Sequence, residues 1–84
     1  MKYVYVLRNR KISAYNDPFI DVQDKASVVK GIQRYCILEK DSAKKNHYDE
    51  SELYLMGTYD DEKGEYDLLP QKEFLVDLGQ YFEK

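Results

Sequence analysis

The stretch "LYLMGTYDDEKGEYDLLP", residues 53–70, carries two alternating runs of residues on either side of an acidic, glycine-containing tip. Alternation with a period of two indicates a β-strand, because successive side chains point to opposite faces of a sheet. Gly64 can adopt the positive φ that closes a turn with a bulge, and the Asp60 carboxylate can accept hydrogen bonds from the turn's own amides. Pro70, which has no amide hydrogen, is expected to end the second strand. The stretch therefore predicts a β-hairpin.

The carboxylates of the hairpin tip do not predict a metal or catalytic site. A calcium loop needs oxygen ligands at alternating positions, a central glycine and a late bidentate glutamate, and "DDEKGEYD" lacks that spacing. Paired catalytic carboxylates need a cleft and one carboxyl with a raised pKa, which a solvated tip does not supply. Cys36 and His47 are the only residues of their kinds, and the four glycines are scattered. We expect no enzyme activity, no metal and no cofactor.

The first half of the chain predicts two extended segments and a helix. Residues 2–9, "KYVYVLRN", alternate like the hairpin and predict a strand. Residues 12–22 predict a second extended segment, which Pro18 interrupts or confines to a sheet edge. Residues 24–41 predict the main helix, with Asp24 as its N-cap. The apolar stripe that this helix buries is expected to comprise Val28, Val29, Ile32, Tyr35 and Cys36. Gly31 costs the main helix about 1 kcal/mol relative to alanine, which suggests a close approach to the sheet.

The second half of the chain adds a loop and a last helix around the hairpin. Residues 42–51 are polar and predict a loop. Residues 71–84 predict a short amphipathic helix with an apolar face made by Phe74, Leu75, Leu78, Tyr81 and Phe82. We therefore expect a single α+β domain, residues 1–84, with an antiparallel sheet of about four strands in the order ββαββα.

Length and composition limit the class of protein. A chain of 84 residues buries only about 60–65% of its unfolded surface, so oligomer formation is a natural supplement to its core. No apolar run approaches the roughly 20 residues that cross a bilayer, and the start "MKYVYVLRNRK" has no secretory pattern. The unpaired cysteine suits a reducing compartment. These features predict a cytoplasmic protein without membrane contact.

Charge is distributed unevenly along the chain. Residues 1–45 contain ten Lys or Arg and five acids, a net charge of +5, whereas residues 46–84 contain three Lys and eleven acids, a net charge of −8. A mildly acidic protein is a poor general binder of duplex DNA, because neutralised phosphates supply most of the non-specific affinity. The basic half could form a groove for one strand. The two halves could equally complement each other inside the fold or across a dimer, and for a sequence taken at random that is the favoured alternative.

Nine tyrosines without a tryptophan suit a binding surface, because half-exposed tyrosines are typical of protein interfaces and of base-stacking platforms. They also suit strands for ordinary reasons of β-propensity. If helices cover the face with Val4, Val6, Leu53 and Leu55, the other face presents Tyr3, Tyr5, Tyr54 and Met56. The residues predicted to contact single-stranded DNA are then Tyr3, Tyr5 and Tyr54 by stacking, and Arg8, Arg10, Lys11, Lys44 and Lys45 through phosphates. The same aromatic face could instead be the interface of a homodimer, and the residues alone slightly favour that interpretation. The two interpretations are compatible if a dimer juxtaposes two basic halves, so we expect a homodimer.

Two motifs, in order, suggest a family. An Ala-Tyr-x-x-Pro-Phe segment is present as Ala14, Tyr15, Pro18 and Phe19, and a Leu-Tyr-x-x-Gly-x-Tyr-Asp-x-x-x-Gly hairpin as Leu53, Tyr54, Gly57, Tyr59, Asp60 and Gly64. With Pro70 and Leu78 after them, the chain resembles the small nonstructural protein of gokushoviruses, tailless single-stranded-DNA phages of the microvirus family. It departs from the family at the helix start, where Lys25, Ala26 and Ser27 replace an acidic Gly-Glu-Ala.

The resemblance implies a non-capsid accessory protein of the host cytoplasm that acts in viral single-stranded DNA synthesis or in the switch from replication to packaging. It offers no catalytic motif. Its expected partners are single-stranded DNA or a DNA–protein complex, with phage replication or procapsid proteins as further partners. The alternative function is a dimeric protein–protein regulator without affinity for DNA.

Overall fold

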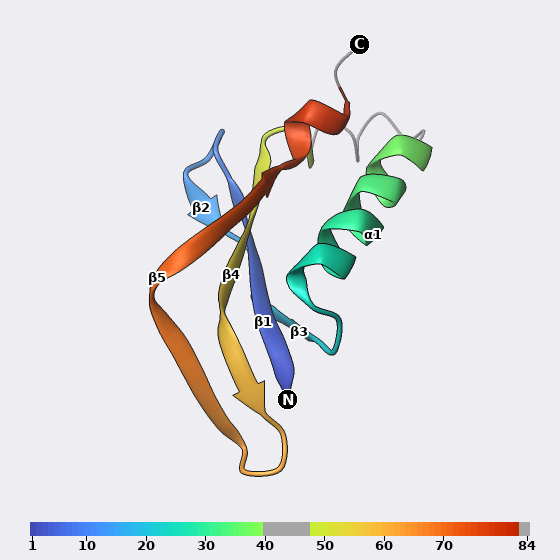
Figure 1. The fold of residues 1–84 in the computed structure, drawn as a ribbon. Helices are drawn as coiled ribbons and strands as arrows, with labels where there is room; N and C mark the ends of the chain where they lie inside the picture. The colour runs from blue at the N-terminus through green and yellow to red at the C-terminus, as the bar shows by residue number, and fades with distance from the viewer. Residues whose placement is uncertain (40–47, 83–84) are drawn as a thin grey trace.

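The computed structural model describes residues 1–39 and 48–82, which form one antiparallel sheet with a helix on one side (Figure 1). The strands are β1 (Lys2–Asn9), β2 (Ala14–Tyr15), β3 (Phe19–Asp21), β4 (Ser51–Asp60) and β5 (Glu65–Asp77). The strand order is β2-β1-β4-β5, and β3 pairs with the same edge of β1 as β2. The predicted α+β class, with an antiparallel sheet and one main helix, is confirmed.

The predicted second extended segment is divided into two short strands. In β2, Tyr15 pairs with Arg8, and in β3, Phe19 pairs with Tyr5, so both lie along β1. Pro18 lies between them, where it has no ladder hydrogen bond to supply. This division makes five strands where about four were expected.

The β4–β5 hairpin has the predicted turn. Gly64 has a φ of +67°, and its amide donates a 2.7 Å hydrogen bond to the Asp60 carbonyl. The Asp60 carboxylate accepts hydrogen bonds from the amides of Glu62 and Lys63, at 3.0 and 3.3 Å. The acids of the tip therefore surround a turn that is closed by hydrogen bonds from its own backbone amides to Asp60.

Two predictions for the end of the chain are wrong, namely the end of the second hairpin strand at Pro70 and the amphipathic helix over residues 71–84. Pro70 does not end β5, because the strand bulges there: between the pairs Leu55–Glu73 and Gly57–Leu68, β4 advances by two residues and β5 by five. The bulge interrupts the ladder of hydrogen bonds, so the strand tolerates the missing amide hydrogen of Pro70, and β5 bends at this point (Figure 1). Residues 71–77 therefore continue the strand, and only the 3-10 turn η1 (Leu78–Tyr81) follows, capped by the Asp77 carboxylate.

Helix α1 (Lys25–Leu38) begins as predicted. Asp24 is its N-cap, and its carboxylate accepts a 3.0 Å hydrogen bond from the Ser27 amide. Val28 and Cys36 are buried, but Tyr35 is 43% exposed. A methyl group at Gly31 would have no neighbour within 4 Å, so the expected close approach to the sheet is wrong.

The cap predicts a pH dependence of stability. Hydrogen bonds from Ser27 lower the pKa of Asp24 below the usual 3.8, so this contribution is present above that value and is lost as the pH falls through the lowered folded pKa. Asp24→Asn keeps a capping side chain without a titrating group. Urea unfolding at pH 7 and pH 3 is therefore expected to show a smaller acid-induced loss of stability in Asp24→Asn than in the wild type. Equal losses in both proteins would contradict the role of the carboxylate.

The core lies between α1 and one face of the sheet, termed here the covered face. Its buried residues are Tyr5, Val28, Cys36, Leu53, Val76 and Leu78. The expectation that Val4 and Val6 share this face with the leucines is wrong. Leu53 pairs with Leu7 and Leu55 pairs with Tyr5, and residues paired across antiparallel strands point to the same side.

No described helix is long and apolar enough to cross a membrane.

Candidate binding surface on the open sheet face

The face opposite α1 carries a row of three aromatic rings. We term it the open face, because no helix within residues 1–39 and 48–82 lies over it (Figure 1). Tyr15 of β2, Tyr54 of β4 and Phe74 of β5 form the row, with ring centroids 6.2 Å apart for the first pair and 5.8 Å for the second. Tyr15 is 49% exposed and Phe74 is 54% exposed. The sheet thus presents aromatic rings from three strands to solvent.

Two cations lie over the ring at one end of the row. The Lys72 Nζ atom is 4.9 Å from the centroid of the Tyr15 ring, and the Arg8 guanidinium carbon is 5.9 Å from it. Both distances lie within the range of a cation–π interaction. Lys72 forms no ion pair with another residue in the described part of the chain, so its charge is available to a ligand.

The two arginines of the first strand region are engaged by acids. Arg10 contacts Asp77 at 2.9 Å, Glu52 at 3.3 Å and Glu50 at 3.5 Å, and Arg8 lies 3.7 Å from Glu52. The hydrogen bond to Asp77 is the largest cause of a raised pKa at Arg10. The basic and acidic halves of the sequence therefore complement each other here, inside the fold.

Glu52 also fixes the middle ring of the row. The Tyr54 hydroxyl donates a 2.8 Å hydrogen bond to the Glu52 carboxylate, and this bond raises the pKa of Tyr54. The ring is consequently held by its hydroxyl as well as by its neighbours Tyr15 and Phe74, which preorganises the row.

An apolar hollow lies beside the row toward the hairpin. It measures about 360 Å³ and is lined by Val4, Pro18, Ile20, Met56, Tyr66 and Leu68. Ile20 and Leu68 are exposed, whereas Val4 is buried at its base. The open face thus combines an aromatic row with an apolar surface, and such a patch is typical of a binding site.

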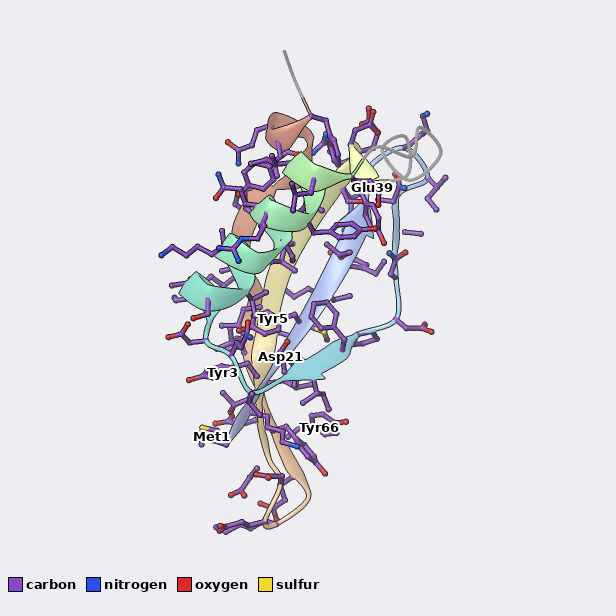
Figure 2. All side chains as sticks on the ribbon, turned by 90° about the vertical axis from the view of Figure 1, so that its right-hand side faces the viewer. Met1, Tyr3, Tyr5, Asp21, Glu39 and Tyr66 are labelled. Carbon is purple, nitrogen blue, oxygen red and sulfur yellow. The ribbon has the colours of Figure 1, made fainter. Side chains whose placement is uncertain are left out.

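Two of the predicted stacking residues are not on this face. Tyr5 is fully buried in the core, and its hydroxyl donates a 2.7 Å hydrogen bond to the Gln23 carbonyl. Burial, and then Asp21 and Asp24, raise the pKa of Tyr5 to about 12. Tyr3 packs against this core on the same side, and Figure 2 shows both tyrosines near Asp21. Tyr5 cannot stack on a base in this fold, so its predicted role is wrong.

The other predicted residues have different outcomes. Tyr54 and Arg8 lie together on the open face, whereas Arg10 is held by its three acids. Lys11 is exposed in the turn after β1 and forms no ion pair with another residue within 1–39 and 48–82. Lys44 and Lys45 lie outside the described residues.

Sequence reasoning missed three residues of the open face, namely Tyr15, Lys72 and Phe74. Tyr15 belongs to the Ala-Tyr-x-x-Pro-Phe segment, which was the available signal. Lys72 and Phe74 lie in the segment for which the sequence predicts a helix, so the sequence does not indicate their position beside β4.

The described residues offer little for other chemistry. Cys36 is buried, and burial raises the pKa of its thiol, which disfavours the reactive thiolate. No three His, Cys, Asp or Glu side chains within the described ranges are grouped to hold a metal ion. His47 lies outside those ranges.

Comparisons with protein-family models, curated proteins and solved structures found no match to this chain.

Proposed function

We propose that this chain is a non-enzymatic accessory protein of a single-stranded-DNA phage, and that it binds single-stranded DNA on its open face. The observation that carries the proposal is the exposed row of Tyr15, Tyr54 and Phe74, with Lys72 at one end. An open sheet with aromatic rings is the platform on which several single-strand binders stack bases. The proposed task is in viral DNA synthesis or in the switch to packaging, in the host cytoplasm.

In this proposal the rings and the cations have separate tasks. Each base has a π-face, so stacking on Tyr15, Tyr54 and Phe74 tolerates any sequence. Lys72 and Arg8 neutralise phosphates at the β2 end of the row. Because Glu52 lies beside Arg8, few phosphates are neutralised, and the affinity depends more on stacking than on charge.

Phe74→Ala is expected to weaken binding of a single-stranded oligonucleotide about tenfold, because stacking contributes about 1–3 kcal/mol per base. Binding is measured by quenching of tyrosine emission, which no tryptophan masks and which the substitution leaves in place. The matched control is Tyr35→Ala, which removes an exposed ring from α1 on the other side of the sheet. Equal affinity of Phe74→Ala and wild type would contradict the proposed platform.

Lys72→Glu is expected to weaken the same binding and to reduce the slope of log affinity against log salt by about 1, as the loss of one phosphate contact does. Lys11→Glu, in the exposed turn, is the comparison for a charge change outside the row. A salt slope unchanged in Lys72→Glu would remove this lysine from the site.

A protein–protein regulator without affinity for DNA is the second candidate. It is favoured by the apolar hollow and by the ion pairs that occupy Arg8 and Arg10. Its partners would be a second copy, as in the predicted homodimer, or phage replication or procapsid proteins. Absence of oligonucleotide binding even at low salt would favour this candidate over the first.

A further inference from the structure

The outward side of α1 is basic and has an apolar floor. Residues 25–38 contain Lys25, Lys30 and Arg34 and no acid. Lys25 is paired with Glu73 at 2.7 Å, but Lys30 and Arg34 form no ion pair with any residue in the described ranges. These two cations line a groove of about 490 Å³ together with Gln33, Ile37 and Leu38. Ile37 and Leu38 are 61% and 66% exposed, so the α1 groove offers both charge and apolar surface.

The hairpin tip, residues 60–67, has the opposite character. It contains five acids and one lysine, a net charge of −4, and residues 61–67 are all exposed. Tyr66 is 59% exposed and rests against Tyr59, with ring centroids 4.9 Å apart. The tip therefore joins a surplus of carboxylates to an exposed tyrosine, a residue that is enriched at interfaces.

The two surfaces cannot meet within one molecule. The hairpin extends beyond the N-terminus, away from α1, in a molecule 43 Å long (Figure 1). Figure 2 likewise shows Tyr66 on the hairpin side, apart from the helix. Only a second copy can bring its tip to the groove.

We propose that the hairpin tip of one copy docks in the α1 groove of a second copy. The carboxylates of the tip lie against Lys30 and Arg34, and Tyr66 covers the apolar side chains of Ile37 and Leu38. The strands of a hairpin are only about 5 Å apart, so the tip is narrow enough to lie along one side of a helix. The opposite charges orient the tip relative to the groove, and the apolar contact removes the Tyr66, Ile37 and Leu38 side chains from water.

This contact joins two different surfaces of the molecule. It either pairs reciprocally in a two-fold dimer, in which each tip docks in the other copy's groove, or continues from copy to copy into a ring or an open chain. The contact uses Tyr66, which also lines the hollow of the open face, but it leaves the row of Tyr15, Tyr54 and Phe74 uncovered. The inference therefore does not rest on the proposed function.

Sedimentation velocity on the DNA-free protein tests the proposal. Over a rising concentration series, the average mass of the wild type is expected to rise to that of a dimer or a larger assembly, and salt is expected to weaken association because the charges are exposed. Lys30→Glu/Arg34→Glu is expected to need at least about tenfold more protein for the same average mass, which corresponds to about 1.4 kcal/mol. Lys11→Glu, which reverses an exposed charge outside the groove, is expected to behave as the wild type. Circular dichroism verifies that each variant is folded.

A charge exchange gives the decisive comparison. Asp61→Lys/Glu62→Lys/Glu65→Lys, which reverses the net charge of the tip from −4 to +2, is expected to be monomeric alone. Lys30→Glu/Arg34→Glu is expected to be monomeric as well, because each variant then has like charges on both surfaces. An equimolar mixture is expected to associate, since every tip then finds a groove of opposite charge. A mixture that stays monomeric would overturn the proposal, as would a wild type that is monomeric at every concentration. Groove variants that keep self-association but lose oligonucleotide binding would also overturn it and assign Lys30 and Arg34 to phosphates.

Discussion

Gly57→Ala is expected to lower the free energy of unfolding by about 3 kcal/mol, because a methyl group there would collide with the backbone of β5. The added Cβ would lie 2.7 Å from the Leu68 Cα atom and closer still to the Asp67 carbonyl oxygen. Neither atom can move without displacing the strand, since Gly57 pairs with Leu68 next to the bulge of β5. The φ of +158° at Gly57 adds a conformational cost for alanine.

Urea unfolding, followed by circular dichroism, measures this effect against a matched glycine. Gly31→Ala adds the same methyl group to α1 at a site with no neighbour within 4 Å. Alanine also favours the helix, so Gly31→Ala is expected to raise the free energy of unfolding by about 1 kcal/mol. Equal stability of Gly57→Ala and the wild type would mean that β4 and β5 do not approach each other this closely.

Elements with local signals were predictable from the sequence. The turn depends on Gly64 and Asp60, which are within four residues of each other, and the helix start depends on Asp24 and Ser27. In both cases the hydrogen bonds join near neighbours, so the residue types alone specify them. These predictions did not depend on how the rest of the chain folds.

Strand β5 was not predictable in the same way. The segment "EFLVDL" has apolar residues that fit a helix or a strand, because a run this short does not distinguish the two periods. Pairing of Phe74 with Tyr54 and of Val76 with Leu53 decides the outcome, and both partners lie more than 15 residues away. A bulge at Pro70 then allows one strand to continue past a residue that normally ends one.

The candidate site was only partly predictable for a related reason. Alternation separated Tyr54 from Leu53 and Leu55, but it could not say which side of the sheet α1 covers or which side of β1 shares a face with Tyr54. That choice depends on the register of β1 against β4, which places Tyr5 opposite Leu55. The acids that hold Arg10 come from residues 50–77, so its ion pairs likewise required the tertiary fold.

Replacement of Tyr5 tests this assignment of the two faces, and among the proposed variants it has the largest expected loss of stability. Tyr5→Ala is expected to lower the free energy of unfolding by about 4 kcal/mol, because it empties a fully buried aromatic site among Val28, Leu53 and Leu78. Tyr5→Phe keeps the ring and loses only the 2.7 Å hydrogen bond to the Gln23 carbonyl, so its expected cost is about 1 kcal/mol. Urea unfolding at pH 7 measures both.

The Tyr5 hydroxyl also predicts an alkaline effect. Its pKa is raised from 10.0 to about 12 in the folded protein, so its contribution is complete below pH 10 and is lost as the pH rises through 12. Tyr5→Phe is therefore expected to lose less stability than the wild type between pH 10 and pH 12. Because Tyr5 lies on the covered face, folded Tyr5→Phe is also expected to bind single-stranded DNA with unchanged affinity. If a folded Tyr5→Phe protein no longer binds DNA, the binding surface lies on the side of α1 and not on the open face. The Tyr5 hydroxyl is on that side, so its loss would affect binding there.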